Sequence, residues 1–386
     1  MPKYPLIHGI AESTRDLTLY RCFSSGSHIG AFVQERIWVG TAFVGGQFSE
    51  DQLVFNEVHF KSDHLADWAQ RSGFVPLNPP PDGMRWVVGY RSPGPVKATL
   101  SDDVTVEIAF EGGLHLEQGR IAGTEAPVLV VKVPNPTGHR EITNRFLFPL
   151  RDLLTFATTT PAFVEEIDLH TPHAVHRLGD GTEVPADVEL IGRLIQPRDE
   201  DRELDRMYPH QMLFSLTDWP SDFSALVHNW LEISERYESS LRLLMGLYYA
   251  PPLWQATRVL TLTQALEAYH RVALPESPAS VVAAERKARI LAGLDPDLPK
   301  SDRHWLSQRL EHAEEPTLRK RLQEVGDRVA VILDPMLSNT AQFADELANV
   351  RNTFRRESGV IERDGPSRPR VSVRFGQGDL KYIAGV

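Results

Sequence analysis

The chain contains 386 residues and has a net charge of −11, with 41% hydrophobic and 24% charged residues. This length exceeds one typical hydrophobic core and predicts two or three domains of a soluble globular protein. The acidic balance excludes a broad electrostatic clamp on nucleic acid. A local one stays open, because residues 351–374 hold seven arginines against two glutamates and one aspartate.

Cysteine content and hydropathy predict the compartment. Cys22 is the single cysteine, which excludes an internal disulfide. No apolar run is long enough to cross a bilayer, and the first residues lack the apolar core of a secretory signal. These features predict a cytoplasmic protein with no membrane partner.

Residues 1–205 predict a β-rich domain. Short apolar runs, several of them alternating and divided by Gly and Pro, are typical of strands at 31–33, 36–40, 54–60, 84–90, 104–110, 114–118 and 128–133. Asp180-Gly181 favours a hairpin turn. Helices are predicted over 63–72, with Gly73 as the stop, and from Thr143 through 151–157. Many short strands with irregular connections predict a sandwich or a distorted barrel.

Residues 206–386 predict an all-α bundle, because the apolar period changes from two to 3.6 after residue 220. Helices are expected at 225–250, 254–272, 281–292, 302–312, 317–333 and 338–355. Their short connections favour antiparallel neighbours. Beyond Gly359 the helical period is lost, and residues 371–375 read as a strand. The fold class predicted for the chain is therefore α+β, with the β-rich domain first.

Three segments of the helical half carry a family resemblance: 262–270, 316–322 and 351–354, the last containing Arg351-Asn352. In this order they resemble the HEPN domain of the ApeA family of anti-phage defence proteins. Residues 55–60, followed by Leu65 and Trp68, resemble the N-terminal domain of the same family. The resemblance implies a metal-independent endoribonuclease of the abortive-infection type that needs no cofactor. It also implies that the chain binds RNA (tRNA or another cellular RNA), forms a homodimer and answers a phage-derived trigger.

The chemistry explains which residues matter. Cleavage through the 2′-hydroxyl of RNA needs a group that transfers protons near neutral pH and a fixed cation for the phosphoryl oxygens. The resemblance assigns Arg351 to phosphate stabilisation, Asn352 to positioning and Glu267 to pairing with the motif arginine. Arg356 occupies the position of the expected histidine. Arginine stays protonated, so the sequence predicts strongly reduced or absent cleavage.

Alternative interpretations stay open at this point. Arg351 is also compatible with a structural salt bridge, and Glu267 with a solvated helix face. The whole bundle is compatible with a non-catalytic module that binds RNA or nucleotides or mediates dimerisation. A third interpretation is a sugar- or nucleotide-binding β-domain on a helical scaffold, for which no motif is present.

Two groups of histidines invite a metal-site interpretation. His170, His173 and His176 are spaced by three, but Pro172 and a nearby Gly-Asp-Gly turn disfavour a helix there. Exposed loop histidines are expected instead. A second group, formed by His59, Asp63 and His64, lacks any supporting cluster. The sequence therefore predicts no metal site.

Overall fold

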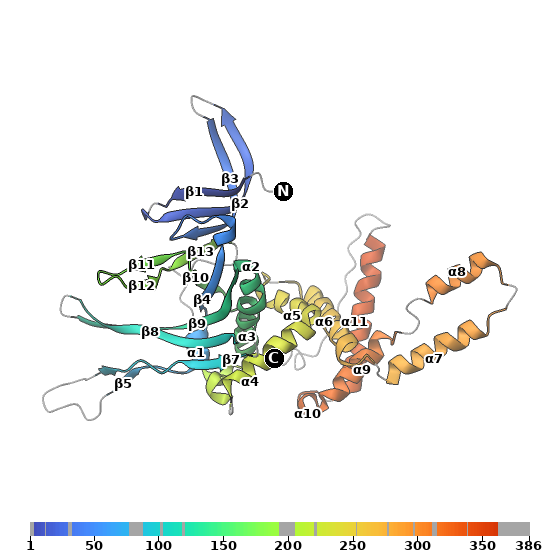
Figure 1. Cartoon of the computed structure of the whole chain (residues 1–386). Helices are drawn as coiled ribbons and strands as arrows, with labels where there is room; N and C mark the ends of the chain where they lie inside the picture. Colours follow the sequence, from blue (N-terminus) through green and yellow to red (C-terminus); the bar gives the residue numbers. More distant parts are fainter. Residues whose placement is uncertain are drawn as a thin grey trace. The chain divides into compact units, whose positions relative to one another are not determined.

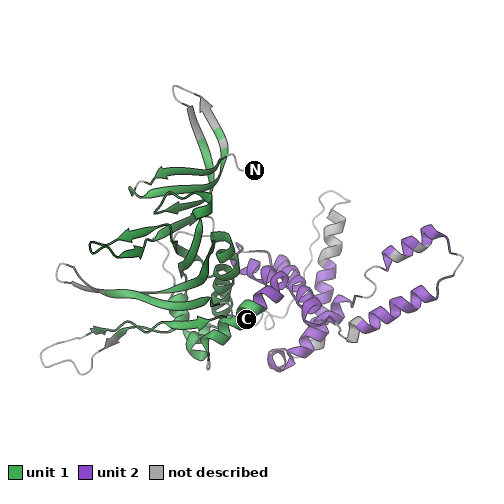
Figure 2. Ribbon diagram, in the orientation of Figure 1, with its two compact units in different colours: residues 1–232 green, residues 233–386 purple. Residues whose placement is uncertain are grey.

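A computed structural model describes the chain over residues 4–11, 13–29, 33–76, 88–100, 103–117, 120–192, 205–219, 222–251, 253–275, 278–295, 298–310, 315–337 and 339–361. The chain divides into two compact units, residues 1–232 and 233–386 (Figure 2). The domain boundary expected at 205/206 separates segments that would fold independently of each other. A division by contacts does not test independent folding, so that boundary stays a prediction. None of the described helices has the length and apolar content that crossing a bilayer requires.

Unit 1 is built on a nine-stranded sheet in which every pairing is antiparallel (Figure 1). In spatial order its strands are β1 (Tyr4–Ile10), β2 (Asp16–Ile29), β3 (Val33–Val44), β13 (Val188–Gly192), β10 (Val164–His170), β4 (Val54–Ser62), β9 (Arg120–Gly138), β8 (Thr105–Glu117) and β7 (Val96–Thr99). Two small sheets pair β5 (Phe74–Pro76) with β6 (Val88–Tyr90), and β11 (Val175–Arg177) with β12 (Glu183–Pro185). Strands predicted at 104–110 and 114–118 are one continuous strand, β8.

The central strand β4 shows how sequence sets the two faces of the sheet. Val58 and Phe60 are 2% and 1% exposed and point to the core, whereas Glu57 and His59 alternate onto the opposite face. Phe55 shares the buried face with Val58 although it lies three positions away. A register shift between 55 and 57 in the pairing with β9 accounts for this spacing.

Helices, rather than a second sheet, cover the buried face. α1 (Leu65–Ala69) and α2 (His139–Ile142) contact β9, and α2 also contacts β4. After α2 come a π-helical turn (Thr143–Leu147) and α3 (Phe148–Thr158), which packs beside α1 (Figure 1). Apolar side chains of these segments are fully buried: Leu65, Trp68, Ile142, Leu147, Leu150 and Leu154. They supply the core that a second sheet would supply in a sandwich, so the expected sandwich or barrel is corrected to one large sheet layered with helices.

Local signals explain where the helices of unit 1 begin and end. Pro149 lies in the first turn of α3 and has no N–H to donate to a backbone hydrogen bond. The π-helical turn before α3 accommodates this missing hydrogen bond. The helix predicted over 63–72 is shorter, because Gln70 adopts a left-handed φ of 51° and ends α1. Gly73 is not the stop; a Cβ there would lie 2.4 Å from the Arg91 carbonyl oxygen. The hairpin predicted at Asp180-Gly181 joins β11 to β12, with Gly181 at φ +86°.

Unit 2 is helical. Its elements are the end of α4 (Phe223–Arg236), α5 (Glu238–Tyr249), α6 (Gln255–Ala273), α7 (Pro278–Ala292), α8 (Lys300–Arg309), α9 (Leu318–Arg328), α10 (Ala330–Leu333) and α11 (Thr340–Ile361). The single helix predicted over 225–250 is two, α4 and α5, divided at Tyr237. There the Tyr237 ring packs on Tyr269 of α6 with 5.1 Å between centroids, a tertiary contact that helical periodicity does not reveal. The α+β class, with a β-rich part followed by a helical part, is confirmed.

The core of unit 2 joins α6, α9 and α11. Leu322 of α9 packs against Ala344 and Ala348, which lie one turn apart on α11. Their small side chains let the two helices approach closely. The partly buried leucines Leu266, Leu318 and Leu347 complete the cluster. This packing holds α11 against α9 and α6.

Candidate functional site

Arg351 of α11 faces Glu267 of α6. Its Nη2 atom lies 3.3 Å from Glu267 Oε2, and the two side chains are 21% and 18% exposed. This partial burial keeps water from fully screening the pair. The guanidinium is therefore held in one place, with part of its donor fork at the surface.

A groove lies beside this ion pair, between the first turn of α9 and α11. Its volume is about 430 Å³, and its lining residues are Thr317, Leu318, Arg319, Ala348, Arg351 and Asn352. Thr317 caps α9: its side chain accepts a hydrogen bond from the Lys320 N–H at 3.4 Å. The capped start of α9 therefore forms part of the groove wall.

The charges around the groove favour an anion. A helix start carries a partial positive charge, and Arg319 and Arg351 add two guanidinium groups. Arg319 is oriented by Asp345 of α11, with Nε 2.9 Å from Oδ1. Guanidinium forks match phosphate oxygens in geometry and charge. The groove therefore brings a helix start and two guanidinium groups together, each paired with one carboxylate, and is a candidate anion site.

Two further polar contacts hold the helices that form the groove. His270 of α6 is 1% exposed, and its Nε2 lies 2.7 Å from Glu324 Oε2 of α9. Arg321 is also buried; it contacts the Glu315 carboxylate at 2.5 Å and donates to the Pro316 carbonyl. His270 lies one turn after Glu267 on α6, yet its burial keeps it away from any ligand in the groove. Both contacts are structural.

The other residues predicted for this site have different outcomes. Asn352 is exposed and lines the groove. The backbone of Arg356 is part of α11. Position 356 is five residues after Arg351, which on an ideal helix is about 140° around the axis from it. Its side chain falls outside the described part of the chain. The strand-like segment at 371–375 also falls outside it, whereas α11 continues past Gly359 to Ile361.

The predicted histidine groupings are corrected by the sheet. His173 and His176 are exposed, as expected, but His170 ends strand β10 with a side chain only 14% exposed. His59 shares a face of β4 with Glu57, while Asp63 and His64 are buried beyond the strand. Among the described residues, the group that brings metal-binding atoms together is Glu57, His59 and His170. The sequence signal was Glu57-x-His59 on a strand; its third member is adjacent only through strand pairing.

Two family models match the chain. The model of ApeA N-terminal domain 1 matches residues 1–230, and the Apea-like HEPN model matches residues 260–355. The second match includes Glu267, Arg351 and Asn352 and ends one residue before Arg356. No curated protein and no solved structure gave a significant match. Both matches confirm the resemblance that the sequence carries.

Proposed function

Since the chain belongs to the ApeA family of HEPN-type defence proteins, we propose that it is an anti-phage ribonuclease whose cleavage step is impaired. The observation that carries the proposal is Arg351, held by Glu267 beside a groove with the donors of a phosphate site. In this proposal, RNA enters the groove and a backbone phosphate binds Arg351 and the start of α9. Asn352 contacts the same phosphate or its ribose.

Cleavage then proceeds with the 2′-hydroxyl of the RNA as nucleophile. Its oxygen attacks the adjacent phosphorus, the P–O5′ bond breaks, and a 2′,3′-cyclic phosphate and a 5′-hydroxyl result. One group accepts the 2′ proton and one donates a proton to the leaving oxygen. Arg351 stabilises the charge that builds on the non-bridging oxygens. This route needs no metal ion in the groove.

Arg356 is where the cleavage step fails in this proposal. A histidine there could exchange protons near neutral pH, whereas arginine stays charged and can only bind. No histidine follows His312 in the chain, so none further along α11 replaces it. Because positions 351 and 356 are about 140° apart on an ideal helix, we propose that two copies of the chain pair and combine their motifs in one cleft.

The decisive experiment compares Arg356→His with the unchanged chain on end-labelled RNA, in EDTA. General acid–base catalysis contributes roughly 100- to 10,000-fold, so Arg356→His is expected to raise the cleavage rate by at least about 100-fold. Its products should carry 2′,3′-cyclic phosphate ends. Adding Arg351→Ala should abolish the gain, and Arg356→Ala, the matched control, should not produce one. An unchanged chain that already cleaves as fast as Arg356→His overturns the proposal.

The second candidate function is a non-catalytic RNA-binding module. The arginine at position 356 favours it, because that residue adds a phosphate contact and removes proton transfer. Tight RNA binding by the unchanged chain, with no cleavage by Arg356→His, selects this candidate. Absence of RNA binding in both proteins contradicts both candidates and points to a ligand of unit 1.

We also propose that residues 1–205 restrain the helical part until a phage-derived trigger arrives. The two-part organisation motivates this step. Expression of Arg356→His with and without residues 1–205 tests it in cells. Greater toxicity of the shortened chain is expected, and equal toxicity contradicts the restraint.

A further inference from the structure

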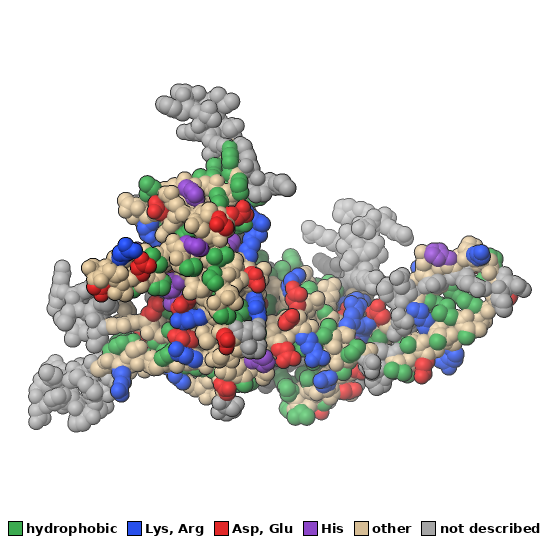
Figure 3. Space-filling model, viewed as in Figure 1, with side chains coloured by type: hydrophobic (Ala, Val, Ile, Leu, Met, Phe, Trp, Pro, Cys, Tyr) green, Lys and Arg blue, Asp and Glu red, His purple; other side chains and the backbone are tan. Residues whose placement is uncertain are grey.

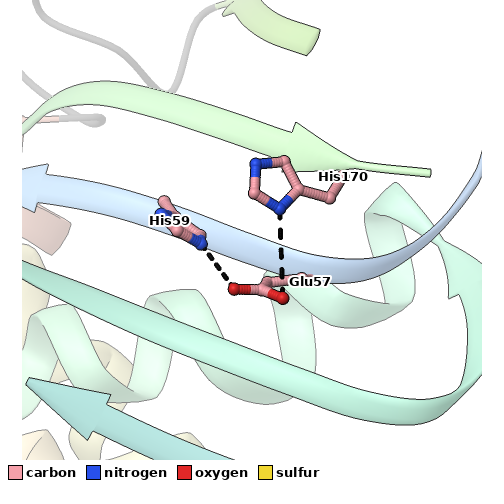
Figure 4. Close-up of side chains that lie close together, drawn as sticks. All are labelled: Glu57, His59 and His170. Atoms are coloured by element: carbon pink, nitrogen blue, oxygen red, sulfur yellow. Dashed lines mark hydrogen bonds and ion pairs between the residues drawn. The ribbon is translucent and has the colours of Figure 1, made fainter. Parts of the chain in front are cut away.

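Three metal-binding side chains meet on the face of the sheet opposite the helices. Glu57 and His59 lie two positions apart on β4 and therefore point to the same side. His170 is the direct partner of Glu57 in the β4–β10 ladder. Figure 4 shows His59 and His170 each joined to the Glu57 carboxylate by a polar contact. Backbone pairing, rather than a loop, fixes these positions.

The distances are close to those of a tetrahedral site. His59 Nε2 lies 2.7 Å from Glu57 Oε1, His170 Nδ1 lies 3.9 Å from Glu57 Oε2, and all three ligand atoms fall within 4.8 Å of one another. Metal–ligand bonds of about 2.0–2.2 Å in a tetrahedron place ligand atoms roughly 3.3–3.6 Å apart. Small side-chain rotations bring the observed separations to these values.

Asp187 gives His170 the setting of a metal-bound histidine. His170 Nε2 lies 2.8 Å from Asp187 Oδ1, so the proton shared with this carboxylate leaves Nδ1 directed at Glu57. A metal-bound histidine usually donates its other ring N–H to a carboxylate in the same way, which fixes the tautomer and the ring plane. The ligand atom of His170 is therefore Nδ1.

Carboxylates around Glu57, His59 and His170 favour the binding of a cation at this cluster. Two more carboxylates lie beside the cluster: Asp187, whose Oδ1 lies 2.8 Å from His170 Nε2, and Asp168, which pairs with His59 in the β4–β10 ladder. Negative potential of this kind attracts a cation. Acidic, basic and histidine side chains are interspersed over the strands of unit 1 (Figure 3).

Lys132 is the group that a metal ion would displace. Its Nζ lies 2.9 Å from Glu57 Oε1, and its side chain is 47% exposed. A half-exposed lysine on a four-carbon stem can turn into solvent. By contrast, Glu57, His59 and His170 are 17%, 23% and 14% exposed, which leaves one open side for a water ligand.

We propose that Glu57, His59 and His170 bind one divalent transition-metal ion of the zinc class, with a solvent molecule in the fourth position. Two imidazoles and one carboxylate suit zinc, whereas magnesium and calcium prefer oxygen ligands alone. This site revises the expectation that the chain has no metal site. It lies wholly within unit 1 and takes no part in the chemistry proposed for the groove between α9 and α11.

The test uses the full chain, stripped with EDTA and then freed of chelator. Titration with Co²⁺ should give the visible absorption bands of a tetrahedral site with one ion per chain, and Zn²⁺ should displace it. His59→Ala and His170→Ala should lose these bands. Asp187→Ala keeps all three ligands and should weaken zinc affinity by about 10- to 100-fold.

His176→Ala is the matched control, because His176 is exposed on β11 and belongs to no ligand set among the described residues. It should bind like the unchanged chain. Glu57→Gln and His170→Gln preserve side-chain length, and circular dichroism in EDTA shows whether each variant is folded. No stoichiometric binding by the unchanged chain, or equal binding by folded His170→Ala and His176→Ala, overturns the proposal. The readout is metal binding alone, so it is independent of RNA cleavage.

Discussion

Arg351 on α11 and Glu267 on α6 form an ion pair that joins the motif helix to the core of unit 2. The two side chains are about one-fifth exposed, so the burial of this pair is intermediate between that of a surface salt bridge and that of a buried one. We expect a coupling free energy of about 1 kcal/mol between the two side chains. Urea unfolding of Arg351→Ala, Glu267→Ala and the double variant measures it. Strictly additive losses would contradict the expected coupling.

The close approach of α9 and α11 depends on small side chains. Ala348→Leu inserts a bulky group against Leu322, and overpacking of this kind costs about 1–3 kcal/mol. Because Arg351 lies three residues further along α11, we also expect weaker phosphate binding in the groove. Glu346→Ala, an exposed position on the same helix, should stay within about 0.5 kcal/mol of the unchanged chain. If Ala348→Leu and Glu346→Ala unfold at the same urea concentration, the contact between Leu322 and Ala348 is not closely packed.

His139 makes unit 1 sensitive to acid. Burial, together with the charges of Arg140 and Arg21, lowers the pKa of His139 to about 4 from its usual 6.5. Between these values the unfolded chain binds a proton that the folded chain does not, so stability falls as pH drops from 6.5 through 4. This loss amounts to about 2–3 kcal/mol at pH 4.5.

His139→Phe tests the acid sensitivity. The histidine ring already packs edge-on against Tyr20 and Phe43, with centroids 5.5 and 5.1 Å away, so a phenyl ring suits the site. Unfolding midpoints of both proteins at pH 7.5 and pH 4.5 give the comparison. We expect a smaller acid shift in the variant. Parallel shifts in the two proteins would assign the acid loss to other groups.

Most of α4, from Phe223 to Glu232, belongs to the fold of unit 1. Trp230 is 7% exposed, donates its indole N–H to the Pro149 carbonyl at 2.6 Å and packs its ring on Phe156. Phe223, Leu226 and Val227 are buried on the same helix. A fragment ending at 205 loses these four side chains, at roughly 1.5–3 kcal/mol each, which approaches the stability of a typical domain.

Two fragments test this boundary. Residues 1–232 should unfold cooperatively, and residues 1–205 should be strongly destabilised or unfolded at the same temperature. Trp230→Phe in the longer fragment isolates the indole hydrogen bond and should cost about 1–2 kcal/mol. If 1–205 unfolds with the midpoint of 1–232, the boundary predicted from composition is correct and α4 is dispensable.

Local patterns allowed most individual elements to be predicted. Alternation identified β4 and β8, and the helical period identified α6, α9 and α11, because burial of one face leaves a direct trace in the sequence. The single sheet was not predictable, since its centre depends on pairings between distant segments. Glu57 and His170 illustrate this: they lie in segments far apart in the sequence, and only the β4–β10 register makes them neighbours.

The candidate groove was predictable in part. Arg351, Asn352 and Glu267 follow from the motif and the resemblance, and the structure brings Arg351 and Glu267 together. Arg319 and the capped start of α9 were not assigned to the site beforehand. Their role depends on how closely α9 approaches α11, which two alanines decide. Alanines contribute little to the apolar periodicity of a helix, so the sequence gives no strong signal for the close approach of α9 and α11.

The strand order also has a kinetic consequence. β1–β2–β3 and β7–β8–β9 are each joined through neighbouring segments, so each three-stranded sheet needs only short loops to close. Joining them requires three pairings between distant segments: β13 with β3, where Val44 meets Glu189, β10 with β4, and β4 with β9. Contacts between such distant segments form slowly. We therefore expect two sheets to appear early and to merge late, so that Glu57 and His170 become neighbours only in the last step of folding.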